Sequence, residues 1–309
     1  MQLNRPHFLV VGPAKTGTTW LYEQLKLING FEMPPTKEIN FFSELNFLHI
    51  INPRSRKALE EFEMAGYEIS VDAIATAKGR FINRRQINRQ YAAEQMRPLW
   101  GWYYRYFPRN MGGISSYLYS LLFATRNNGT TGDISPLYFG IGEQVIKEIA
   151  KWFPELKIVL IIREPVDRAW SNIRMNYYST QAMPDFSIDS YLAKHNLGSD
   201  YKRAITNWER YFKPNQIMYL FYDDLVDNPT GFLQQFLDFV KPGAKATHVI
   251  EETIGKGVNK QMDSVLMEQL LKKNWPQYQF LAQKFGPDSY PAQWLKEAEI
   301  KLELLKTRK

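Results

Sequence analysis

The sequence predicts a three-layer α/β domain, in which a parallel β-sheet is covered by helices on both faces. Short apolar runs such as KIVLII at 157–162 are typical of strands that are buried on both faces. Segments with helical spacing lie between these runs, and strands that alternate with helices form parallel sheets. The fold class is therefore α/β, with a P-loop-like turn, GPAKTGTT at 12–19, after the first strand. We expect a single domain over 1–309, with a mainly helical insertion at about 45–125.

The individual elements follow from local patterns of apolar and turn-forming residues. We expect buried strands at 8–11, 157–162 and 216–221, and a short strand from 131 that meets a turn at Pro136. Amphipathic spacing predicts helices at 20–27, 142–152, 165–178, 200–212 and 230–240. The charged C-terminal part is also expected to be helical.

The composition limits the possible function classes. The chain has 44% hydrophobic residues, which is enough for a sizeable core, and a net charge of +7, which favours anionic partners. No block of like charge forms a nucleic-acid tail, so we expect no nucleic-acid partner. The absence of cysteine excludes disulfides and thiolate chemistry and suits a reducing compartment. Because neither a signal peptide nor a run of about 18 apolar residues occurs, we expect a cytoplasmic protein without a membrane span.

The first strand is followed by a Gly/Thr-rich turn, GPAKTGTT at 12–19, and then by a helix. Such a turn presents backbone N–H groups to an anion, and the helix dipole favours negative charge at the same place. The spacing differs from the loop of nucleotide triphosphatases, in which Lys directly follows the second Gly. Here Thr18 follows Gly17, and Lys15 precedes that glycine by two positions.

This P-x-K-T-G-T-T pattern resembles the 5′-phosphosulfate loop of sulfotransferases that use 3′-phosphoadenosine 5′-phosphosulfate (PAPS). The run REPVDRAWS at 163–171 resembles the 3′-phosphate motif R-x-P-x-x-R-x-x-S of the same family. The stretch from Trp208 to Pro229 follows the family's W-x-x-x-F and Y-D-D-L-x-x-N-P patterns, which we interpret as structural. The run GKGVNK at 255–260 stands where the family keeps a basic loop over the 3′-phosphate.

The resemblance implies PAPS as cofactor, no metal, and specific roles for the matching residues. Lys15 would stabilise the charge that develops on the leaving oxygen. Trp20 would stack on adenine, although a buried tryptophan of the helix is a nearly equal alternative. The remaining cofactor-binding residues are predicted to be Ala14, Lys15, Thr16, Gly17, Thr18 and Thr19 for the 5′-phosphate and Arg163, Ser171, Lys256 and Gly257 for the 3′-phosphate.

The general base is predicted from a second resemblance. The run PTKEINFFS at 35–43 is similar to a K-E-x-H-F-F-D-like segment of heparan-type sulfotransferases, and departs from it at Asn40 and Ser43. Glu38 is therefore the predicted catalytic base, with an ion pair to Lys37 as the alternative role. The His used by cytosolic small-molecule sulfotransferases is missing, since 132–136 reads GDISP, and Asp133 is the reserve candidate.

The acceptor follows only from the branch of the family that the chain resembles. The glutamate base favours the carbohydrate branch, so we expect a hydroxyl or an amine on a glycan or glycolipid. The Arg- and aromatic-rich stretch at 84–109 either stacks on sugar rings or packs as ordinary helices. A non-carbohydrate small molecule is the alternative acceptor. Two other functions remain as alternative hypotheses. The first is a nucleotide kinase or NTPase, and the second is a nucleic-acid-binding module.

Overall fold

The computed structural model describes residues 5–34, 37–40, 42, 123, 129–175, 200–247, 249–250 and 261–307. This part of the chain contains a four-stranded sheet in the order β2-β1-β3-β4, in which every neighbouring pair is parallel. The predicted α/β class is thereby confirmed. The insertion expected at about 45–125 lies, apart from Phe123, outside the described residues and stays a prediction. The strands are β1 (Phe8–Val10), β2 (Gly132–Ile134), β3 (Lys157–Ile162) and β4 (Ile217–Phe221).

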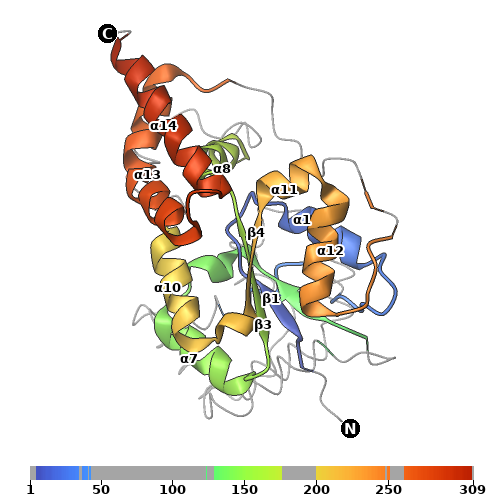
Figure 1. The fold of residues 1–309 in the computed structure, drawn as a ribbon. Coiled ribbons are helices and arrows are strands. Elements are labelled where there is room, and N and C mark those ends of the chain that lie inside the picture. The colour runs from blue at the N-terminus through green and yellow to red at the C-terminus, as the bar shows by residue number, and fades with distance from the viewer. Residues whose placement is uncertain are drawn as a thin grey trace, which may run out of the picture.

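The described helices follow the strands in alternation (Figure 1). Five of them were predicted with bounds, and four of these five begin and end within two residues of the predicted positions, because their caps and prolines act locally. Asp200, Asn228 and Asp263, for example, each accept a hydrogen bond from a backbone amide in the first turn of a helix. The helices are α1 (Thr18–Leu25), η1 (Pro136–Gly140), α7 (Glu143–Trp152), α8 (Pro165–Ile173), α10 (Tyr201–Tyr211), η3 (Pro214–Gln216), α11 (Tyr222–Asp227), α12 (Pro229–Val240), α13 (Ser264–Phe285) and α14 (Tyr290–Thr307).

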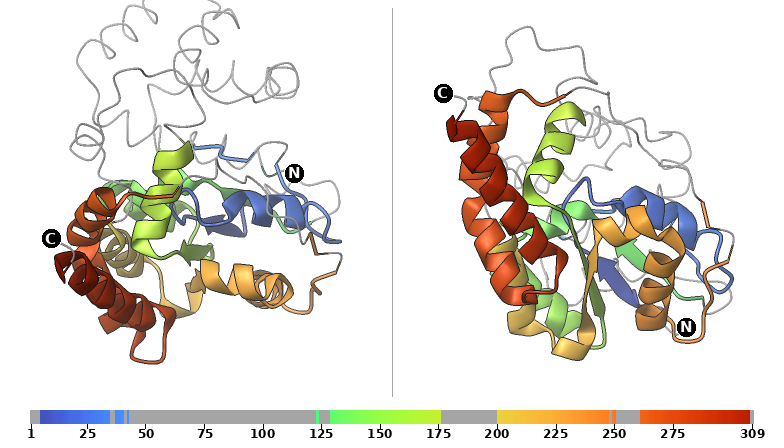
Figure 2. Two further views of the ribbon diagram at one scale, coloured as in Figure 1. Left: turned by 90° about the horizontal axis from the view of Figure 1, so that it is seen from above. Right: turned by 45° about the horizontal axis from the view of Figure 1, so that its top comes forward.

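Alternate residues of the strands point to opposite faces of the sheet and enter two separate cores. On β3, Ile158, Leu160 and Ile162 pack in one core, whereas Val159 and Ile161 pack in the other. The first core is covered by α7, α8, α10, α13 and α14, and the second by α1, α11 and α12 (Figures 1 and 2). A strand that is buried on both faces must be apolar at every position, which explains why the KIVLII run is visible in the sequence.

The block from 208 to 229 has the structural character that the sequence suggested. Trp208 and Phe212 are buried in the first core, and Leu225 is buried in the second. Trp294 and Tyr290 of α14 donate hydrogen bonds to Asp223 (3.2 Å) and Asp224 (3.1 Å), which attach the C-terminal helix pair to α11. No described helix combines the length and the apolarity that a bilayer span requires.

Candidate functional site

Three of the predicted site segments meet at one edge of the sheet. The turn with Lys15 follows β1, and Arg163 follows β3. The segment with Glu38 joins the end of β2, because the Glu38 amide donates to the Ile134 carbonyl at 3.1 Å. The three strands are parallel neighbours, so their carboxyl ends lie at the same edge. Open α/β sheets bind their ligands at this edge.

The turn after β1 runs close to β3 and has an unusual backbone. A Cβ atom on Gly12 would lie 2.8 Å from the backbone nitrogen of Ile161, so only glycine fits there. Lys15 (φ 75°) and Gly17 (φ 82°) both adopt the left-handed conformation. The Thr16 hydroxyl donates to the Pro13 carbonyl at 2.8 Å and closes the turn. A left-handed lysine costs about 1–2 kcal/mol, and strain of this kind is concentrated at functional sites.

The N-terminus of α1 differs from the other helix starts. Gly17 is its N-cap, no side chain caps it, and its first turn contains no acidic residue. The helices α8, α10, α12 and α13 have a capping side chain, while α7 and α11 have acidic residues in the first turn. Among these seven helices, only α1 has neither device. Its first amides and the positive end of its dipole are therefore suited to an external anion such as a phosphate.

Arginines of the segment 163–171 contact the backbone of this turn. Arg163 Nη1 donates to the Lys15 carbonyl at 3.0 Å, and its guanidinium lies over the Tyr222 ring at 4.3 Å. Arg168 is buried, and its Nη1 lies 3.5 Å from the Ala14 carbonyl oxygen. The two segments predicted to bind the two phosphates are thus in direct contact. Arg168 was not among the predicted site residues, although the second Arg of the motif R-x-P-x-x-R was visible in the sequence.

Of the other residues predicted to bind the cofactor, two lie on helices and two lie outside the described residues. Ser171 is buried on α8. Trp20 is also buried, with its ring edge-to-face against Phe232, and its Nε1 donates to the Ile250 carbonyl at 2.7 Å. Trp20 therefore contacts the chain five residues before the run GKGVNK at 255–260, and its stacking on adenine stays a prediction. Lys256 and Gly257 lie outside the described residues.

Glu38 lies in a strained segment and forms an ion pair. Its Oε1 is 2.5 Å from the Lys37 Nζ, and the two side chains are 22% and 16% exposed. Glu38 (φ 62°) and Asn40 (φ 57°) are both left-handed, although neither is glycine. The ion pair that was the alternative interpretation of Glu38 is present. The partial exposure leaves the carboxylate within reach of a ligand, and the role of base stays a prediction.

Asp133, the reserve candidate, is fully enclosed at the end of β2. Its side chain is 1% exposed. The Ser135 hydroxyl donates to Oδ1 and the Tyr138 hydroxyl donates to Oδ2, each at 2.6 Å. Burial and the neighbouring Asp133 raise the pKa of Tyr138 well above its ordinary value, so its hydroxyl stays a donor.

A comparison with protein-family models decides the family. Residues 6–242 match the model described as "Sulfotransferase family", which is well over half of the chain. The chain belongs to the sulfotransferase family. The match contains both segments that were predicted to bind phosphate and the Glu38 segment, so the resemblance that these residues indicated is confirmed at the level of the family.

Individual relatives of this sulfotransferase are distant. It is 25% identical over 131 residues to heparan sulfate glucosamine 3-O-sulfotransferase 6 of Mus musculus, a match covering 39% of this chain and 37% of the relative. The human protein of the same name is 25% identical over 132 residues, covering 39% of this chain and 38% of the relative. The matched region thus spans less than half the length of these relatives. The crystal structure of a sulfotransferase from Alicyclobacillus acidocaldarius superposes with a TM-score of 0.58 and 20% identity, covering 94% of this chain and 98% of that one.

Beside the site, the sulfotransferase chain has a carboxyl group that titrates at an unusual pH. Burial raises the pKa of Glu164 from 4.5 to about 8, and the nearby Asp167 raises it further, while Lys301 and Arg163 oppose the shift. The folded state therefore holds this proton more tightly than the unfolded state. The contribution of Glu164 to stability is complete below about pH 4.5 and is lost as the pH rises through 8.

We expect Glu164→Gln to reduce this loss of stability. Glutamine keeps an oxygen that can accept from the Asp167 amide at the start of α8 but cannot ionise. The free energy of unfolding, measured by denaturant titration at several pH values, should fall less between pH 4.5 and 8 than in the wild type. Glu148→Gln, at an exposed position of α7, should not change the slope. Identical slopes for wild type and Glu164→Gln would contradict the assignment.

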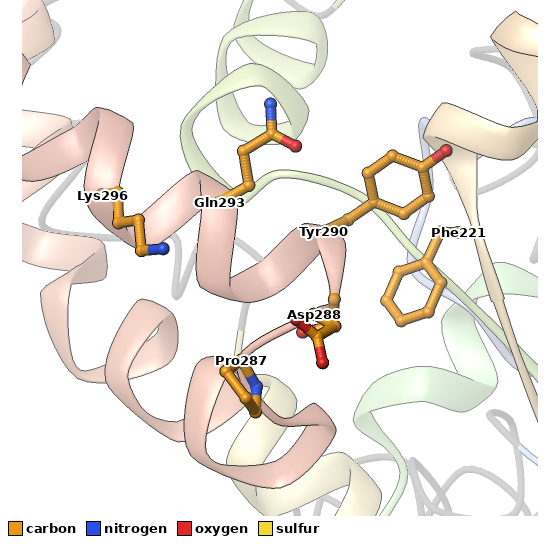
Figure 3. A pocket seen from close by; sticks show the side chains of 7 residues that line it. Phe221, Pro287, Asp288, Tyr290, Gln293 and Lys296 are labelled. Atoms are coloured by element: carbon orange, nitrogen blue, oxygen red, sulfur yellow. The ribbon is translucent and has the colours of Figure 1, made fainter.

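A separate pocket lies between the end of β4 and the start of α14 (Figure 3). Its lining consists of Phe221, Pro287, Asp288, Ser289, Tyr290, Gln293 and Lys296. None of the residues predicted to bind the cofactor or to act in catalysis lines it, and we assign it no role in the transfer. Among the described residues, no group of three His, Asp or Glu side chains is arranged to hold a metal ion.

Proposed function

We propose that this protein transfers a sulfuryl group from PAPS to an acceptor hydroxyl or amine by in-line displacement. One observation carries the proposal: the uncapped start of α1 meets the carbonyl-bound Arg163 at the carboxyl edge of the sheet. Two anion-binding groups that lie side by side suit a ligand with phosphates at both ends. Membership of the sulfotransferase family supports the same donor.

Different tasks are proposed for the three threonines of the turn. The Thr16 side chain is buried and bonded to Pro13, so it maintains the shape of the turn. Thr18 and Thr19, in the first turn of α1, would hold the 5′-phosphosulfate with their amides and hydroxyls. Arg163 would pair with the 3′-phosphate from the neighbouring strand, with Ser171 and the basic stretch around Lys256 completing this part of the site.

PAPS would supply an activated sulfuryl group when bound; its bond to the phosphate oxygen would break as the acceptor oxygen or nitrogen bonds to sulfur. The Lys15 Nζ lies 3.8 Å from the Met175 Sδ, and its ammonium would neutralise the charge that develops on the leaving oxygen. Glu38 would accept the proton of the acceptor group, so that the proton ends on its carboxylate. The protein contributes position, charge stabilisation and a base.

The acceptor that we propose is a glycan hydroxyl. The support is the KEINFF segment around Glu38 and the names of the two mammalian relatives, which act on heparan sulfate glucosamine. Transfer of labelled sulfate from PAPS to heparan sulfate, with 4-nitrophenol as a non-carbohydrate acceptor, separates this proposal from transfer to a small molecule. Labelling of 4-nitrophenol alone would replace the glycan proposal.

Calorimetric titration with 3′-phosphoadenosine 5′-phosphate tests the donor site. We expect magnesium-independent binding by the wild type and about 10–100-fold weaker binding by Arg163→Ala, because a charge-assisted hydrogen bond contributes about 1.5–3 kcal/mol. Arg210→Ala is the matched control, since Arg210 is an exposed arginine that pairs with Glu143 on α7. Absence of binding by the wild type, together with magnesium-dependent binding of ATP, would favour a nucleotide kinase instead.

A further inference from the structure

The segment that carries Glu38 is attached to the end of β2 by its own backbone amides. The Glu38 amide donates to the Ile134 carbonyl, and the Asn40 amide donates to the Ser135 hydroxyl oxygen, both at 3.1 Å. The Phe42 amide lies 3.5 Å from the Tyr138 hydroxyl oxygen. These contacts occur at every second residue of a segment whose backbone is left-handed at 38 and 40, a conformation that is intrinsically unfavourable for glutamate but tolerated by asparagine. The segment therefore depends on its acceptors to keep this conformation.

Two of the three acceptors are hydroxyls that Asp133 orients. A hydroxyl has a single hydrogen, and both Ser135 and Tyr138 donate theirs to the Asp133 carboxylate. Their lone pairs are then left to accept from the amides of Asn40 and Phe42. All three side chains are buried, so water does not compete for these bonds. The Asp133 carboxylate thus sets the direction of the hydrogen bonds that the hydroxyls of Ser135 and Tyr138 form.

We propose that Asp133 is a positioning residue, which acts through Ser135 and Tyr138 to hold the 37–42 segment in the conformation that presents Glu38 to the acceptor. This assignment rests on the proposed function of Glu38 as the base. It replaces the reserve role of Asp133 as a base, because both of its oxygens are occupied by hydroxyl donors and its side chain is enclosed. A residue in this position affects the rate without contacting the substrate.

Hydrogen exchange of the protein alone tests the network without reference to activity. Ser135→Ala and Tyr138→Phe each remove one acceptor, and we expect the amides of Asn40 and Phe42, respectively, to exchange about 10-fold faster. Tyr219→Phe is the matched control, because it also removes a tyrosine hydroxyl that donates to a carboxylate, that of Glu209, away from the segment. Unchanged exchange at both amides in folded variants would overturn the proposal.

Kinetics then distinguish a positioning residue from a base. Ser135→Ala and Asp133→Asn should each lower kcat by about 10-fold, with the affinity for 3′-phosphoadenosine 5′-phosphate unchanged within about twofold. Since both residues act through one network, kcat of the double variant should be no lower than kcat of the less active single variant. A loss in Asp133→Asn as large as in Glu38→Gln, with normal exchange at 38–42, would make Asp133 the base and overturn the proposal.

The same variants separate failure of this inference from failure of the proposed function. Full kcat in Glu38→Gln would remove Glu38 as the base. Faster exchange in Ser135→Ala and Tyr138→Phe would still support the role of Asp133 in holding the segment, and unchanged exchange would still overturn it. Thermal unfolding of every variant shows whether that variant is compared in its folded state. Ser135→Ala, which removes a single hydroxyl, is the mildest of these changes.

Discussion

Replacing Lys15 by Ala is expected to lower kcat for sulfuryl transfer by roughly 10²–10³-fold, the usual loss when one group that stabilises a developing negative charge is removed. The left-handed backbone at position 15 is strained, and the Lys15 carbonyl is bound by Arg163. The side chain is thus attached to a turn that Arg163 holds, and its Nζ lies 3.8 Å from the Met175 Sδ. Such a preorganised cation stabilises the leaving oxygen more than a flexible surface lysine would.

Single-turnover transfer of labelled sulfate measures this effect without interference from product release. Lys26→Ala is the matched control, because Lys26 follows the same helix and forms an exposed ion pair with Glu23 and a contact over the Tyr22 ring, both away from Lys15. We expect the control to keep the wild-type rate. A higher KM for PAPS at unchanged kcat in Lys15→Ala would show that Lys15 only binds the donor and does not act in the transition state.

Glu38→Gln is expected to lower kcat by about 10²–10⁴-fold, the range typical of a lost general base. Glutamine has nearly the same shape as glutamate, and the backbone bond from Glu38 to Ile134 does not involve the side chain. The affinity for 3′-phosphoadenosine 5′-phosphate should therefore stay at the wild-type value, which calorimetry measures alongside the rate.

The ion pair with Lys37 offers a direct control for this prediction. If the carboxylate served only to pair with Lys37, then Lys37→Met and Glu38→Gln would lower kcat by the same factor. We expect a much smaller loss in Lys37→Met, because the base is still present in that variant. Equal losses would assign the effect to the ion pair and remove Glu38 from the chemistry.

Local patterns in the sequence were sufficient for the elements of the fold. The strand at 157–162 was predicted with its observed bounds, because a strand that is covered on both faces is apolar throughout. Helix starts such as those at Pro165 and Pro229 were visible because proline and capping side chains act within one turn. The turn at 12–19 was recognised because glycine and lysine spacing reflects backbone geometry.

Contacts between distant segments required the tertiary structure. The bond from Arg163 to the Lys15 carbonyl joins residues that are 148 positions apart, and the Asn40 amide meets a hydroxyl 95 positions away. No local pattern encodes such pairs, since they follow from the strand order β2-β1-β3-β4. The left-handed backbone at Glu38 and Asn40 was equally invisible, because neither residue is glycine.

Glu38 and Asp133 illustrate the difference between what the sequence determines and what the tertiary structure decides. The sequence by itself determined that Glu38 and Asp133 were the candidates, because the first lies in a K-E-x-x-F-F run and the second lies in the GDISP run, where cytosolic small-molecule sulfotransferases carry their His. Only the tertiary structure separated them, since it leaves Glu38 partly exposed beside Lys37 and encloses Asp133 between two hydroxyls. Burial and hydrogen-bond partners depend on the packing of distant segments, and they are the reason why we propose Glu38 as the base and Asp133 as a positioning residue.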